Sequence, residues 1–223
     1  MSAYDPFWVH ASGRLRVYTP QALSLAQPDP GVLRKAQRGD ERAFSLILRA
    51  YETPVFNYVL RLVGGNRSLA EDLTQEVFLR VYQGLPKFSL RSKFTTWLFQ
   101  VTKNRVLDEL RASERRPRSV VALDDIAPLE VLDAPIERLD EIDALWRAVE
   151  DLSTDLKMAL LLRDVVGLSY TEIADSLEVT LATVKWRIYK AREEVQLALA
   201  REGITFGQTE KPAAEATAAE AVS

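Results

Sequence analysis

Apolar residues recur at helical spacing through most of the chain. Between residues 32 and 63 they return every three or four positions until two adjacent glycines interrupt the pattern, which predicts amphipathic helices. Asp40 is a candidate cap for one of these helices. Pro54, which the first turn of a helix tolerates, is a candidate start for the next one. No segment of useful length alternates between apolar and polar residues, so we expect an all-α fold.

Two further helices complete the first group. Ser68, followed three residues later by Glu71, has the pattern of a capping box and predicts a helix that ends near residues 84–86. After the loop KFSLRSK, the segment FTTWLFQVTKNRVLDELR carries an apolar stripe in which Trp97 is assigned to the core. We expect these helices to form a first domain over residues 31–111, preceded by a loose N-terminal extension at residues 1–30.

The helical period fails between residues 112 and 140. Pro117, Pro128 and Pro135 stand there among acidic residues, so this segment is predicted to be a linker. Helical patterns resume in a second domain, residues 141–203. The last segment, residues 204–223, has low complexity and little apolar bulk, which predicts a disordered tail. The expected architecture is two small helical domains joined by a Pro-containing acidic linker.

The second domain contains a helix-turn-helix pattern. Ser169 and Glu172 form a second capping box that opens a short helix, and Thr180 caps a longer helix after a turn of about three residues. Glu178 occupies the turn position where glycine, or another residue that tolerates positive φ, is common. This combination of helix, tight turn and basic helix is typical of DNA-binding domains.

The longer helix has two distinct faces. Its inward positions are Val184, Ile188, Ala191 and Val195, and the opposite face carries Ala182, Lys185, Trp186, Tyr189 and Lys190. Two aromatic rings and two lysines turned away from the core favour contact with a DNA groove or with phosphates. Helical hairpins in bundles produce the same pattern, however, and in that case the two rings cover a neighbouring helix or a protein partner.

Composition excludes several classes of site. The chain has 223 residues, a formal net charge of -3, no cysteine and a single histidine, His10. Without cysteine there is no disulfide framework and no thiolate metal site, and one imidazole argues against a Ser-His-Asp triad or a multi-histidine site. We therefore expect no catalytic residues, metal or cofactor. No apolar run approaches the roughly 20 residues of a membrane span, so we expect a cytoplasmic protein without membrane insertion.

Positive and negative charge are segregated along the chain. Residues 85–118 contain nine basic and three acidic side chains, whereas residues 124–155 contain two basic and eleven acidic ones. In the basic stretch, cationic and aromatic side chains alternate beside an amide, which suits single-stranded nucleic acid because bases stack on rings while phosphates meet cations. The alternative is a solvated basic face over a core built on Phe94 and Trp97.

Four segments together resemble a known family. AEDLTQEVF, KFTTWLFQVTKNRVLDELR, the Pro-rich linker, and VVGLSYTEIADSL with TVKWRIYKAR follow one another as in the bacterial RNA polymerase sigma factors of the extracytoplasmic-function (ECF) class. The resemblance covers residues 31–200. The loop SLRSKF lacks the usual glycine, Trp186 replaces a small residue, and Leu181-Ala182 replaces a small pair. These departures bear on promoter preference rather than on the class.

The resemblance implies an alternative sigma factor that binds core RNA polymerase and directs promoter recognition, DNA melting and transcription initiation, in a stress or envelope response. Core RNA polymerase and promoter DNA are the implied partners, with an anti-sigma factor as a further one. The residues implied in polymerase binding are Asp72, Gln75, Glu76 and Arg80. Those implied at the minus-ten element are Phe88, Lys93, Lys103, Asn104 and Arg105. Those implied at the minus-thirty-five element are Thr183, Lys185, Trp186, Arg187, Tyr189, Lys190 and Arg192.

Within these sets the roles differ. Phe88 and Asn104 would form a pocket for one extruded base, which offsets part of the cost of opening the duplex. Lys103 and Arg105 would lie on nearby phosphates. Arg187 and Arg192 would hold the DNA backbone. The acidic linker would lie in the positively charged RNA path of the polymerase until the transcript displaces it.

Two other classes of protein stay open on the residues alone. An ordinary helix-turn-helix repressor or activator would bind duplex DNA without polymerase, but it leaves the basic stretch and the long linker unexplained. A polymerase-binding adaptor would use Trp186 and Tyr189 for a protein contact and never touch DNA.

Overall fold

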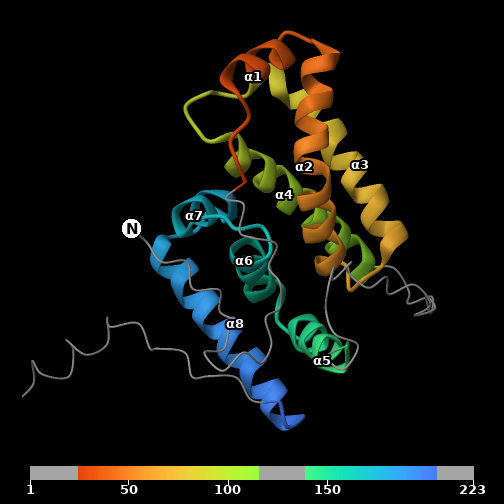
Figure 1. Ribbon diagram of the computed structural model, residues 1–223, viewed down its shortest axis with the longest axis vertical. Helices are drawn as coiled ribbons and strands as arrows, with labels where there is room; N and C mark the ends of the chain where they lie inside the picture. Colours follow the sequence, from red (N-terminus) through yellow and green to blue (C-terminus); the bar gives the residue numbers. More distant parts are fainter. Residues whose placement is uncertain (1–24, 116–138, 205–223) are drawn as a thin grey trace, which may run out of the picture.

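The computed structural model describes residues 25–115 and 139–204 (Figure 1). In these ranges the chain forms eight α-helices and one short 3-10 helix. The first group comprises α1 (Pro30–Gln37), α2 (Glu41–Leu62), α3 (Arg67–Gly84), η1 (Leu85–Lys87) and α4 (Phe94–Arg115). The second group comprises α5 (Leu139–Glu150), α6 (Thr154–Asp164), α7 (Tyr170–Leu177) and α8 (Leu181–Arg201). The prediction of an all-helical chain with two groups of helices is confirmed. The N-terminal extension up to residue 24, residues 116–138 of the predicted linker, and the predicted tail from residue 205 lie outside the described residues.

Pro54 does not begin a helix. It lies inside α2, which runs without interruption from its Asp40 cap, where the carboxylate accepts a hydrogen bond from the Ala43 N–H at 3.0 Å. A proline inside a helix removes one backbone hydrogen bond and costs about 3 kcal/mol. Tyr51 and Val55 on either side of it are almost fully buried, so tertiary packing outweighs the local preference to break the helix.

The start of α3 also differs from the expectation. Asn66 is its cap and accepts a hydrogen bond from the Leu69 N–H at 3.0 Å, so Ser68 lies within the first turn and forms no capping box. Glu71 instead pairs with Arg67 at 2.9 Å. The error arose because asparagine caps a helix as well as serine does, and Asn66 stands two residues earlier.

The chain just before α1 is fixed to the first domain. Asp29 caps α1, and its carboxylate accepts hydrogen bonds from the N–H groups of Gly31 and Val32. The Gln27 side chain donates to the Thr95 hydroxyl at 2.6 Å, and the Tyr51 hydroxyl donates to the Ala26 carbonyl. These contacts hold the segment just before α1 against α2 and α4.

The helix-turn-helix prediction is confirmed in detail. Ser169 and Glu172 form a complete capping box at the start of α7, and the Thr180 hydroxyl accepts from the Thr183 N–H at 3.1 Å at the start of α8. Glu178, in the turn, has a φ of 59°. Four positions expected to face inward on α8, Val184, Ile188, Ala191 and Val195, are all buried.

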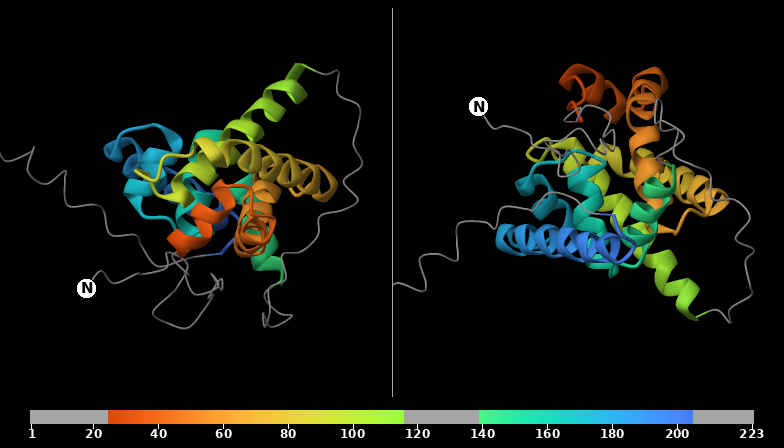
Figure 2. Two further views of the ribbon diagram at one scale, coloured as in Figure 1. Left: turned by 90° about the horizontal axis from the view of Figure 1, so that it is seen from above. Right: turned by 60° about the horizontal axis from the view of Figure 1, so that its bottom comes forward.

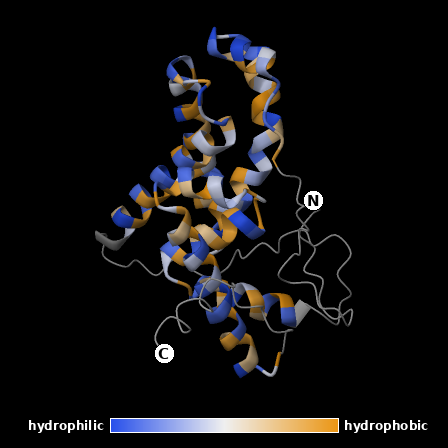
Figure 3. Ribbon diagram, turned by 90° about the vertical axis from the view of Figure 1, so that its left-hand side faces the viewer, coloured by the Kyte–Doolittle hydropathy of each residue, from blue (hydrophilic) through white to orange (hydrophobic). Residues whose placement is uncertain are grey.

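The two groups of helices share one continuous apolar core. Helix α7 packs along α4, and α6 packs against α2, so the second domain lies directly under the first (Figures 1 and 2). Apolar and polar residues alternate along the helices in Figure 3, as expected where each helix buries one face. The C-terminal part of α4 extends beyond the other helices in the left view of Figure 2.

Candidate nucleic-acid and protein interfaces

The outer face of α3 is polar and open. Asp72, Gln75, Glu76 and Arg80 are all exposed, because the buried positions of α3, among them Leu73 and Val77, point the other way. Two of the four are tied to α4: Glu76 accepts from Arg105 at 2.5 Å, and Arg80 lies 3.6 Å from Asp108. The hydrogen bond from Arg105 lowers the pKa of Glu76, so this carboxylate is charged at neutral pH.

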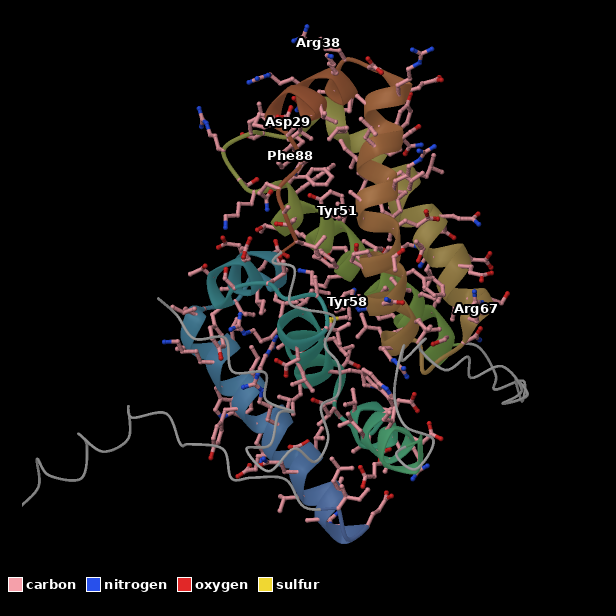
Figure 4. The ribbon with its side chains drawn as sticks, viewed as in Figure 1. Asp29, Arg38, Tyr51, Tyr58, Arg67 and Phe88 are labelled. Carbon is pink, nitrogen blue, oxygen red and sulfur yellow. The ribbon has the colours of Figure 1, made fainter. Side chains whose placement is uncertain are left out.

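Phe88 lies in the core rather than on the surface. It is 7% exposed, and its ring centroid lies 4.8 Å from that of Trp97 and 6.0 Å from that of Phe94. The Gln37 side chain donates to the Phe88 carbonyl at 2.9 Å, and Figure 4 shows the ring directed into the domain. In this conformation no face of the ring is free to stack with a base, and the exposed apolar side chain of the loop is Leu90.

The other residues predicted at the minus-ten element occupy different environments along α4 and the loop before it. Asn104 is exposed. Lys103 is buried, and its Nζ donates to Glu178 of the second domain at 2.6 Å. Arg105 is held between Glu76 and Glu109. Lys93 is exposed and lies 3.1 Å from Glu172. Two of the predicted DNA-contacting cations therefore pair with acidic residues at the two ends of α7.

The outer face of α8 is open. Trp186 is 60% exposed and Lys185 beside it is exposed, while Thr183, Tyr189 and Lys190 are partly covered. Lys190 lies 2.7 Å from Glu193, one helical turn further along. A ring and an ammonium group are thus presented together on the first two turns of the helix.

Two arginines of α8 serve the fold as it stands. Arg187 donates to Asp155 at 2.5 Å, and Arg192 donates to both carboxylate oxygens of Asp164 at 3.2 and 2.6 Å. The Asp164 side chain is 9% exposed, and this desolvation raises its pKa against the attraction of Arg192. These pairs fix α8 against the two ends of α6. They therefore set the direction in which the outer face of α8 points.

Two further kinds of site, a metal centre and a membrane span, have no counterpart in the part of the chain that the structure describes. Among the described residues, no group of three or more His, Cys, Asp and Glu side chains is placed to hold a metal ion. In residues 25–115 and 139–204, no helix combines the length and apolarity that crossing a bilayer requires.

Comparison with known proteins decides the family. The model of sigma-70 region 2 matches residues 47–116, and the model of sigma-70 region 4 matches residues 142–195. The RNA polymerase sigma-H factor of Pseudomonas aeruginosa is 34% identical over 183 residues, which span 78% of this chain and 94% of that protein. The chain belongs to the ECF class of RNA polymerase sigma factors.

Other comparisons agree with this assignment. The ECF RNA polymerase sigma-E factor of Escherichia coli K12 is 34% identical over 186 residues, covering 78% of this chain and 95% of that one. In fold, the sigma factor is similar to CnrH in complex with the cytosolic domain of CnrY, with a TM-score of 0.61, 21% identity, and 78% and 98% of the two chains covered. It is also similar to RpoE in complex with the anti-sigma factor NepR from Bartonella quintana, with a TM-score of 0.57, 22% identity, and 70% and 96% covered.

The function of the chain follows from its membership of the ECF sigma factors. The sigma factor binds core RNA polymerase, recognises promoter DNA and initiates transcription without being an enzyme itself. The resemblance found from the sequence is therefore confirmed, and an ordinary repressor or an adaptor that avoids DNA is excluded.

Sequence reasoning missed the contacts between the two domains. Ser176 donates to the Thr96 carbonyl at 3.1 Å, and the Arg61 guanidinium lies 3.6 Å from the ring centroid of Trp146. Glu178 is the residue in the sequence that could have indicated these contacts. A charged residue at a turn position that favours glycine suggests that its side chain has a partner elsewhere in the protein.

Proposed function

We propose that the outer face of α8 contacts the minus-thirty-five element, with Lys185 and Trp186 at its centre. This assignment rests on the exposure of Trp186. The residue is 60% exposed and lies beside an exposed lysine, on a helix whose core-facing residues are buried. An indole offers an apolar surface to thymine methyl groups in a major groove, and a lysine offers charge to phosphates or to guanine. Tyr189 and Lys190 extend the same face, and Thr183 lies at its N-terminal edge.

Arg187 and Arg192 would reach DNA phosphates only through exchange of their partners. Both are engaged with carboxylates of the second domain. Their first role in this proposal is to orient α8, and their side chains reach the DNA backbone where Asp155 or Asp164 releases them.

We propose that α4 and the loop before it contact the minus-ten element. Asn104 and Lys93 are exposed, and Arg105 and Lys103 lie on the same helix. Phe88, which is buried, would support the loop from below rather than stack with a base. Leu90, which is 51% exposed, is the apolar side chain that this loop presents to a strand.

We propose that α3 binds the polymerase clamp through Asp72, Gln75, Glu76 and Arg80. All four side chains are exposed on one face. Leu79, which is 56% exposed, and Tyr82, which is 40% exposed, lie on the same helix and add apolar area to that polar face. Protein interfaces combine such an apolar centre with a polar rim.

The cellular setting is proposed by analogy. Solved structures with this fold were determined with anti-sigma factors or with a cytosolic partner domain, which supports an anti-sigma factor as a partner of this chain. We propose action in the cytoplasm and control by stress or by the cell envelope, and the similarity to relatives named as ECF sigma factors supports this proposal. The acidic linker keeps its proposed place in the RNA path of the polymerase.

Run-off transcription with purified core polymerase tests the DNA assignments. Lys185→Glu should reduce initiation on a promoter with a minus-thirty-five element and should weaken the salt dependence of duplex binding. Arg201→Glu is the matched control, because Arg201 is an exposed cation at the far end of α8. Equal loss in both variants would refute the assignment of the N-terminal half of α8.

A further inference from the structure

We infer that Trp186 selects a thymine at one base pair of the minus-thirty-five element, through the C5 methyl group and the O4 atom of that base. The inference rests on the proposed contact between the outer face of α8 and this element, and it adds the class of base that the face prefers. The indole ring contacts the methyl group, and the indole Nε1–H donates to O4 beside it.

Trp186 faces away from its own domain. It stands on the second turn of α8, which begins at Leu181, and it is 60% exposed. Val184 and Ile188, on the other face of the same turns, are buried. Side chains in a helix lean toward the preceding turn, and the residue there, Ala182, is small and exposed. The indole therefore stands over the N-terminal end of the helix with its ring open to a partner.

The cations on the same turns contribute little to the choice of a base. Arginine is the side chain that recognises guanine through two hydrogen bonds, but Arg187 is held by Asp155 at 2.5 Å. Lys190 is held by Glu193 at 2.7 Å. Lys185 is exposed, and its ammonium group suits phosphates, which every DNA sequence carries. Selection among bases on this face therefore falls to the aromatic side chain.

Thymine is the base whose major-groove edge matches an indole. It presents a methyl group and, next to it, the O4 acceptor. The indole of Trp186 combines an apolar ring with one donor and has no acceptor. Cytosine presents an amino donor and no methyl group, and guanine and adenine present acceptors without a methyl group. A ring with a single donor therefore gains most from thymine.

The selection concerns one base pair. In helices that enter a major groove, residues about one turn apart contact successive bases, so a single indole covers a single pair. Further along α8, Glu193 and Glu194 are partly exposed, and the negative charge of the DNA backbone disfavours carboxylates there. The N-terminal half of the helix is therefore the part that enters the groove, with Trp186 near its centre.

A promoter library tests the inference with the complete holoenzyme. Core polymerase and the full chain transcribe promoters with a randomised minus-thirty-five element, each marked by a barcode in its transcript. The parent should enrich thymine at one position, on either strand, and Trp186→Ala should lose that enrichment while it keeps the preferences at other positions. Leu197→Ala is the matched control, because Leu197 is a 54% exposed apolar residue of α8 that lies beyond Glu193.

Base analogues isolate the methyl group. Deoxyuridine in place of the selected thymine removes the methyl group and keeps O4 and the base pair. Burial of one methyl group corresponds to about a fourfold change in binding, so initiation by the parent at limiting holoenzyme should fall about fourfold. Trp186→Phe keeps a ring and should keep this response, whereas Trp186→Ala should lose it. No response in the parent, or an equal response in Trp186→Ala, would overturn the inference.

Lys185→Glu separates failure of this inference from failure of the proposed function. If Lys185→Glu lowers initiation but Trp186→Ala leaves the base preferences unchanged, the outer face of α8 still contacts the element and the selection of thymine by Trp186 is wrong. If neither variant changes initiation from the element, the proposed contact of α8 is itself wrong, and the inference falls with it.

Discussion

Arg61 of α2 and Trp146 of α5 should respond to substitution in opposite directions. The guanidinium lies 3.6 Å from the indole centroid, and burial lowers the pKa of Arg61 to about 10, against the attraction of Glu150 and Asp143. Arg61 stays charged at neutral pH. The structure therefore contains a buried cation whose main cover is one aromatic ring.

Truncation of the ring removes both packing and cover. Substitutions of buried aromatic residues by alanine cost about 3–5 kcal/mol, and a desolvated cation–π contact contributes about 2 kcal/mol. Because Trp146 is only partly buried, we take the low end and expect Trp146→Ala to lower the free energy of unfolding by about 3 kcal/mol. For a chain of this size that is a fall in Tm of about 6–12 °C.

Replacement of the cation should not be harmful to stability. Methionine has a similar length and no charge, so it removes the cost of keeping a cation out of water, which is several kcal/mol for a buried ion. This gain exceeds the loss of the cation–π contact, which contributes about 2 kcal/mol. Asp143 is exposed and Glu150 is partly exposed, so neither carboxylate is left as a buried, unpaired charge, and we expect Arg61→Met to change the free energy of unfolding by between zero and a gain of about 2 kcal/mol.

Thermal and urea unfolding of both variants, followed by circular dichroism, measures the difference. Trp146→Phe serves as the control, because it keeps a ring over Arg61 and should lose less stability than Trp146→Ala. If Arg61→Met loses as much stability as Trp146→Ala, then the protein groups around Arg61 stabilise its charge fully. In that case the interface does not contain an incompletely hydrogen-bonded cation.

Three further outcomes are expected. Tyr58→Phe should cause no loss of stability, or a gain of about 1 kcal/mol, because the Tyr58 hydroxyl is buried and finds no hydrogen-bond partner within residues 25–115 and 139–204. A loss of that size in a melting experiment would contradict this. Ser169→Ala should cost about 1 kcal/mol, seen as a fall in Tm of about 2–4 °C, because the capping box of α7 is complete. Hydrogen bonds from Arg105 and Lys103 lower the pKa of Glu76 and of Glu178, and in Glu172 burial raises the pKa but hydrogen bonds from Ser169 outweigh it. The stability from these carboxylates is fully present above their ordinary pKa near 4.5 and is lost as pH falls through the lower folded values; a Tm that is constant from pH 6 to about pH 3 would contradict the assignment.

Local rules predicted the second domain well because its signals lie within a few residues of one another. The capping box at Ser169, the cap at Thr180 and the buried face through Val184 and Ile188 are all set by short-range spacing, and the structure reproduces each of them. The same rules failed at Pro54, where burial of the flanking residues keeps α2 continuous.

The environment of the candidate site depended on long-range packing, which spacing does not report. The resemblance implies Phe88 as part of a pocket for an extruded base, but its ring fills space between Phe94 and Trp97. The resemblance implies Lys103 at a phosphate, but in the structure Lys103 pairs with Glu178, which lies 75 residues away in the chain. The pattern within one helix predicts which face of the helix a side chain occupies. Only the tertiary structure shows which residues that side chain contacts.

The continuous core across both groups of helices limits how such proteins can be recombined. A chimera that joins the first domain of this chain to the second domain of a relative would change the neighbours of both α2 and α4. Arg61 would lose Trp146 of α5 and Thr96 would lose Ser176 of α7, unless the relative has the same residues at these positions. Exchange of promoter specificity by swapping domains should therefore succeed more often when the residues of the shared surface are carried over together. Inheritance of the two halves is therefore coupled through the surface at which they pack against each other.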